Sequence, residues 1–161
     1  MRKTLFISIV LLCLLNVVVT QAQQTKAAKE AEYERLKVTP QGTAVDQYNK
    51  REVAWLKDPG SDELGKQAKE AVVPGSQAEG AVLERIETYK SRGVHLTPES
   101  RHDTTVISVE VSGDTATVKT LENPNWVSTS GRTYIRTAVP HTYTLKKVGD
   151  NWKVSVDDFE L

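Results

Sequence analysis

The chain has 161 residues, 21 basic and 21 acidic side chains, a net charge of zero and one cysteine. These values exclude a multidomain enzyme, a strongly basic nucleic-acid-binding protein and a disulfide-stapled scaffold. One domain with a modest core remains, because a chain of this length buries roughly two-thirds of its unfolded surface.

Residues 1–22 have the layout of a secretory signal peptide. Arg2 and Lys3 precede an apolar run over residues 5–19, and small residues follow before Gln23. We expect cleavage there, export to the periplasm or the extracellular space, and no membrane insertion afterwards; an uncleaved membrane anchor is the alternative. The exported chain would carry a net charge of −2, since Arg2 and Lys3 are lost, and no cysteine, since Cys13 lies in the apolar run.

The first half of the exported chain reads as helices. Residues 23–40 are rich in Ala, Glu and Lys and are expected to be helical or disordered, ahead of a single domain over residues 41–161. Thr43 is the expected cap of a helix that ends at Lys57, and Ser61 starts a third helix that stops before Pro74.

A fourth helix has the clearest ends. Residues 76–79 form a capping box, and Gly93 fits a left-handed stop. Its expected buried stripe consists of Val82, Leu83, Ile86 and Tyr89.

After Pro98 the apolar residues recur with a period of two, which indicates strands. The first strand is expected to point Thr105, Ile107, Val109 and Val111 to one face, and a turn at 112–114 leads to a second strand with Ala116, Val118 and Thr120. A loop that includes residues 123–125 and 128–131 should precede a long strand over 132–148, interrupted at Pro140, and then a last strand around Val154. The order predicts an α+β fold, with N-terminal helices packed on a curved antiparallel four-stranded meander.

Two segments of the strand region resemble the closing strands of NTF2-like proteins. They are VEVSGDTATV at 109–118 and YTLKKVGDNWKV at 143–154, and the resemblance extends over about residues 103–158. It implies a cone in which a bent sheet wraps helices around an apolar pocket, as in small stand-alone domains of exported bacterial proteins. The family includes isomerases, dehydratases, transport factors and binding modules without catalysis, and its sheets often pair into homodimers.

Glu52 is the sharpest candidate for chemistry. On the second helix it shares an arc with Tyr48, Trp55 and other apolar residues, which would desolvate the carboxylate and fit it as an acid, a base or a ligand anchor. The alternative, favoured about two to one because buried unpaired carboxylates are rare, is that Glu52 reaches solvent or pairs with an arginine.

The strand region offers a second group of candidates. Arg132, Tyr134 and Arg136 share one face of a regular strand and could hold a carboxylate or phosphate, although a solvated sheet face is the commoner explanation. His141 and Tyr143 also share a face, and Trp126 is expected at a pocket rim or interface. His102 and Asp103 are adjacent, so they are expected to point to opposite faces of a strand. No metal-ligand spacing, phosphate loop or nucleophile elbow is present in the sequence, and no metal or cofactor is expected.

The leading hypothesis is an exported, non-catalytic module that holds a small ligand or an exported protein in its pocket or on its sheet. A small exported isomerase or lyase with Glu52 as general base is the first alternative. An inhibitor or immunity-type protein that binds one exported partner is the second.

Overall fold

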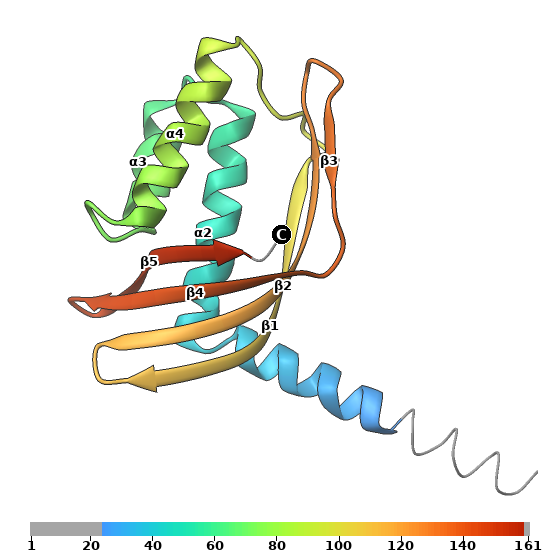
Figure 1. Cartoon of the computed structure of the whole chain (residues 1–161), viewed down its shortest axis with the longest axis vertical. Helices are drawn as coiled ribbons and strands as arrows, with labels where there is room; N and C mark the ends of the chain where they lie inside the picture. Colours follow the sequence, from blue (N-terminus) through green and yellow to red (C-terminus); the bar gives the residue numbers. More distant parts are fainter. Residues whose placement is uncertain (1–23, 160–161) are drawn as a thin grey trace, which may run out of the picture.

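The computed structural model describes residues 24–159, in which helices precede an antiparallel sheet (Figure 1). The predicted signal peptide, residues 1–22, lies outside these residues. Helices span residues 24–37, Pro40–Lys57 (α2), Asp62–Glu70 (α3) and Gln77–Ser91 (α4). None of the described helices is long and apolar enough to cross a membrane.

The helix starts follow from their capping residues. Ser61 Oγ accepts a hydrogen bond from Leu64 N, and Ser76 Oγ accepts one from Glu79 N, each at 3.3 Å. The expected cap of α2 at Thr43 is wrong, because Thr39 caps the helix through Gly42 N and Pro40 occupies its first turn. Proline is favoured there because its missing N–H would be unpaired in any case.

Five strands follow in an antiparallel sheet: β1 (Arg101–Ser112), β2 (Thr115–Val127), β3 (Thr133–Ile135), β4 (Val139–Val148) and β5 (Asn151–Phe159). Their order is β1-β2-β4-β5, which is the predicted four-stranded meander, and the short β3 pairs with the far end of β2.

The expected single strand over 132–148 is two strands. Ala138 has a φ of 55°, which ends strand geometry between β3 and β4, and its N–H donates to Asn123 Oδ1. Pro140 lies inside β4, paired with Leu121. The expected loop at 123–125 is also wrong, because those residues continue β2 and pair with β1.

The expected inner face of β1 is wrong in its first half. Thr104 and Val106 are buried there, whereas Thr105 and Ile107 are half-buried. A bulge between Val106 and Ser108 shifts the register, so that Val109 packs against the core beyond it.

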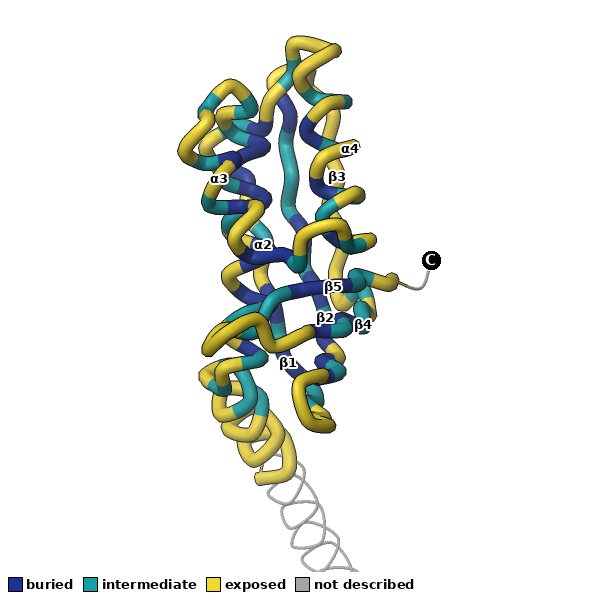
Figure 2. The backbone as a smooth tube through the Cα atoms, turned by 90° about the vertical axis from the view of Figure 1, so that its left-hand side faces the viewer, coloured by how far each residue is buried: buried dark blue, intermediate teal, exposed yellow. Residues whose placement is uncertain are grey.

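The sheet bends so that the far end of β2 stands upright with β3, while β4 and β5 lie across the lower part (Figure 1). Helices α2 and α4 lie on its concave side, where α2 contacts β1 and β5, and α4 contacts β5. The chain after α3 joins the same sheet through a parallel bridge between Val72 and Val154. Burial is concentrated between the helices and the sheet (Figure 2). On α4, Val82 and Ile86 are buried as expected, Tyr89 is half-buried, and Leu83 is exposed, so that its expected burial is wrong.

Candidate functional site

A cavity of about 480 Å³ opens between α2, α4 and the concave face of the sheet. We call it the cone cavity. It is lined by residues from both helices and all five strands: Asn49, Glu52, Arg85, Tyr89, His102, Pro124, Trp126, Tyr134, His141, Asp157 and Phe159.

The strands supply polar side chains to this cavity because their inward positions change in character along their length. On β2, Ala116 and Val118 point inward first, and Thr120 and Glu122 follow at the same spacing of two. On β4 the same change runs from Leu145 through Tyr143 to His141 in the opposite chain direction. Because the strands are antiparallel, the polar residues of both meet at one end of the concave face.

Glu122 is the most deeply buried charged residue at this end, with 0% exposure. Its carboxylate accepts hydrogen bonds from the hydroxyls of Thr104, Thr120 and Tyr143, and a further one from Asn49 Nδ2 at 3.3 Å. These donors satisfy the carboxylate, so that it can remain inside the protein.

His102 and Trp126 are residues of the cavity wall whose buried ring nitrogens make no hydrogen bond to the residues that the structure describes. The His102 side chain is 7% exposed, and its Nε2 lies 3.0 Å from Glu122 Oε2. Apart from this contact, neither ring nitrogen of His102 meets a polar atom as a hydrogen-bond partner among residues 24–159, and Trp126 Nε1 has no hydrogen-bond partner there either. Each such group costs about 1–3 kcal/mol until something bonds to it.

Glu52 is buried, with 2% exposure, and it forms a salt bridge with Arg85 of α4. Burial raises the pKa of Glu52, while the Arg85 guanidinium opposes the shift. Glu52 therefore is desolvated as predicted, and it also has the arginine partner of the alternative hypothesis. Because the Glu52 carboxylate is already paired with Arg85, it is a poor base for taking a proton from a ligand.

His141 and Asp157 form a second acid–base pair in the cavity wall. His141 Nδ1 lies 2.9 Å from Asp157 Oδ1, and Tyr48 donates its hydroxyl to Asp157 Oδ2 at 3.2 Å. Burial, together with the charges of Glu52 and Asp157, raises the pKa of Tyr48, which keeps this phenol protonated as a donor. In the tautomer that carries the proton on Nδ1, toward the carboxylate, Nε2 of His141 has the lone pair of a base.

Comparisons of sequence find no relative: no family model matches the chain, and no curated protein does. Solved structures do match. The intermembrane space region of the chloroplast protein ARC6 is 15% identical, with 73% of this chain and 91% of that chain covered and a TM-score of 0.58. A protein of unknown function from Mycobacterium tuberculosis is 16% identical, with 81% and 74% covered and a TM-score of 0.53. A Streptomyces avermitilis protein, described as a dehydratase of the NTF2-like family, is 20% identical, with 73% and 95% covered and a TM-score of 0.41.

The chain has the NTF2-like fold. The bent sheet of order β1-β2-β4-β5 with helices on its concave side is the expected cone. Identities this low show the fold alone, and proteins that share a fold often differ in function.

Four of the site residues predicted from the sequence do line the cone cavity. They are Glu52, Trp126, Tyr134 and His141. Tyr48 and Tyr143 lie just behind its wall, and Tyr143 stacks against His141 with ring centroids 5.7 Å apart. Burial, Asp157 and Glu122 all raise the pKa of Tyr143.

The remaining candidates lie elsewhere. Trp55 faces away from the cone cavity toward Gly65 of α3, and its ring lies 5.9 Å from Lys90 Nζ of α4. Arg132 lines a neighbouring pocket, and Arg136 packs on the Tyr134 ring at 5.6 Å. His102 and Asp103 do point apart, as expected for adjacent strand residues, but His102 finds Glu122 on the next strand instead.

Sequence reasoning missed Asn49, Arg85 and Asp157, which line the cavity, and the buried Glu122, which accepts a hydrogen bond from Asn49. A signal for Glu122 was present, because it continues the spacing of Ala116, Val118 and Thr120. No such signal exists for Arg85, whose partner lies 33 positions away on another helix. Within residues 24–159, no cluster of His, Cys, Asp or Glu has the geometry of a metal site.

Proposed function

We propose that the protein is an exported module that binds a small polar molecule in the cone cavity. The observation that carries this proposal is the pair of buried polar side chains without hydrogen bonds, His102 and Trp126, in the wall of a cavity of about 480 Å³. A ligand that offers a hydroxyl or carbonyl to these groups would recover the cost of leaving them unpaired. The leader-like residues 1–22 support export.

Native mass spectrometry of residues 23–161, recovered from the exported fraction of a bacterial host, tests the proposal. We expect an extra small mass that is lost on denaturation. His102→Leu removes both ring nitrogens and should lower the occupancy about tenfold, since one good hydrogen bond is worth about that much.

His95→Leu is the matched control, because His95 is exposed and does not line the cone cavity. It should keep the wild-type occupancy. A bare chain that is also not stabilised by any of a panel of polar metabolites would contradict the proposal, because a ligand at 100 times its Kd adds about 2.7 kcal/mol of stability. The predicted cleavage is checked separately: the intact mass of the exported protein should equal that of a chain beginning at Gln23.

The His141–Asp157 pair favours a second function, catalysis by proton abstraction. In this version His141 Nε2, rather than Glu52, takes a proton from a carbon acid of the bound molecule, and Asp157 stabilises the resulting imidazolium. Incubation of the captured ligand with the protein in D₂O should then place one deuterium at the exchanged carbon.

His141→Ala should abolish this exchange, while Glu52→Gln should leave it within a few-fold of wild type. A bound ligand that gains no deuterium in the presence of the wild-type protein would reject catalysis by this route and leave the binding function.

A further inference from the structure

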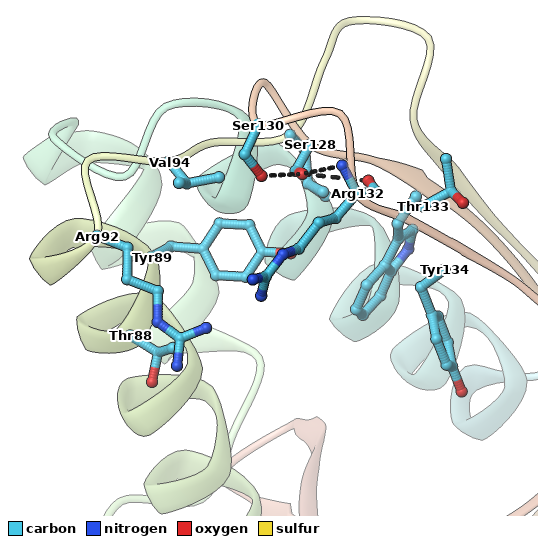
Figure 3. Close-up of a pocket in the computed structure, with 11 residues that line it drawn as sticks. Thr88, Tyr89, Arg92, Val94, Ser128, Ser130, Arg132, Thr133 and Tyr134 are labelled. Atoms are coloured by element: carbon cyan, nitrogen blue, oxygen red, sulfur yellow. Dashed lines mark hydrogen bonds between the residues drawn. The ribbon is translucent and has the colours of Figure 1, made fainter.

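A second pocket of about 530 Å³ adjoins the cone cavity at the end of α4 (Figure 3). The two share the side chains of Tyr89, Trp126 and Tyr134. Its other walls come from the end of α4, the segment after it and the loop between β2 and β3. We call it the arginine pocket, after Arg92 and Arg132.

These two arginines differ from most others in the described chain. Arg35, Arg51, Arg85 and Arg101 each form a salt bridge with a carboxylate. Within residues 24–159, no carboxylate or carbonyl pairs with the guanidinium of Arg92 or Arg132, and the lining of the arginine pocket includes no Asp or Glu. The guanidinium groups of Arg92 and Arg132, which have no carboxylate partner in the described part of the chain, therefore belong to one pocket without carboxylates.

The main chain that carries Arg132 is held in place. Ser128 N donates to Arg132 O at 2.9 Å, and Arg132 N donates to Ser128 Oγ at 3.1 Å, around a turn in which Gly131 has a φ of 78°. Thr129 N donates to His95 O at 2.9 Å, which ties this loop to the segment that follows Arg92. The two arginines thus stand on segments bound to each other.

Hydroxyl groups and aromatic rings complete the lining. Thr88, Ser130 and Thr133 offer hydroxyls, and Figure 3 shows Arg132 reaching toward Tyr89 while Arg92 lies beside Thr88. The last carbonyls of α4 would repel an anion, but Gly93 N and Val94 N bond to Lys90 O and Tyr89 O. Guanidinium groups bind carboxylates and phosphates through two parallel hydrogen bonds.

We propose that the arginine pocket binds the carboxylate or phosphate group of a small organic anion, whose apolar part lies against Tyr89, Trp126 and Tyr134. This site goes beyond the proposed function, because it needs no occupant in the cone cavity. The shared aromatic wall would let one ligand reach both.

NMR titration with inorganic phosphate and, separately, with benzoate tests this site at low ionic strength. Saturable shifts are expected in the amide signals of residues 128–132 and in the Nε–H signals of Arg92 and Arg132. Arg92→Gln and Arg132→Gln should each weaken binding about tenfold, as expected for the loss of a hydrogen bond to a charged group. Tighter binding of phosphate would indicate a phosphate ester, and tighter binding of benzoate an aromatic carboxylate.

Arg136→Gln is the matched control, because it removes the same charge from a neighbouring arginine that lines neither pocket. It should change the affinity less than twofold. Equal losses in all three variants would show attraction to overall charge and overturn the site, as would shifts that do not saturate for either probe. All three arginines are exposed, so the variants should keep the wild-type unfolding temperature.

Discussion

The two ends of the concave sheet face are equally buried, but one is apolar and the other is polar. At one end, Ala116, Leu145 and Val154 join an apolar cluster with residues of α2 and α3. At the other, Thr120 and Glu122 are both 0% exposed, the same as Leu145. Burial therefore does not separate core from site in this protein. The difference is that the polar end holds buried donors and acceptors that need partners, and the ring nitrogens of His102 and Trp126 make no hydrogen bond within the described chain.

Glu122→Ala should break the polar end with the largest effect. It deprives the hydroxyls of Thr104, Thr120 and Tyr143 of their acceptor and removes the charge beside His102. We expect a loss of about 4 kcal/mol in the free energy of unfolding, measured by urea denaturation. Glu122→Gln keeps one acceptor oxygen and should cost clearly less. Equal costs for the two variants would contradict the role of the hydrogen bonds.

Leu145→Ala tests the apolar end, and its effect on stability should be the next largest. Leu145 is 0% exposed, so its truncation leaves a cavity, and we expect a loss of about 3 kcal/mol by the same measurement. Ligand occupancy in native mass spectrometry should stay unchanged, since Leu145 does not line the cone cavity. A loss of ligand with little loss of stability would show that the two ends are not separate.

Glu52→Gln should have the smallest effect, of about 1 kcal/mol, and this effect should depend on pH. Burial raises the pKa of Glu52 above its ordinary value of 4.5, so the folded state binds this proton more tightly than the unfolded state. The wild type therefore loses stability as pH rises from 4.5 through the raised pKa, and the glutamine variant does not. The stability of the variant relative to wild type should increase over that window, in urea denaturation at a series of pH values. A difference that does not vary with pH would contradict the burial of an ionisable carboxylate.

Much of the apolar end could be predicted from local pattern. The spacing of Ala116 and Val118 identified a strand face, and Ser61 and Ser76 identified helix starts. The polar end was harder to predict, because its inward-facing residues are polar and therefore resemble the sequence of a loop. Residues 123–125 include a proline between two asparagines and still continue β2, since pairing with β1 outweighs their weak strand preference.

By itself, the sequence determined the order of the elements, most of their ends and the antiparallel meander, because caps, turns and the two periodicities act over a few residues. Only the tertiary structure decided which side chains meet in and around the cavity. The register of the strands sets Thr104 opposite Glu122 and Thr120 opposite His141, and the packing of α4 on α2 brings Arg85 to Glu52. Those pairings join residues 18 to 33 positions apart, over which local chemistry carries no information about which side chain a buried charge will meet.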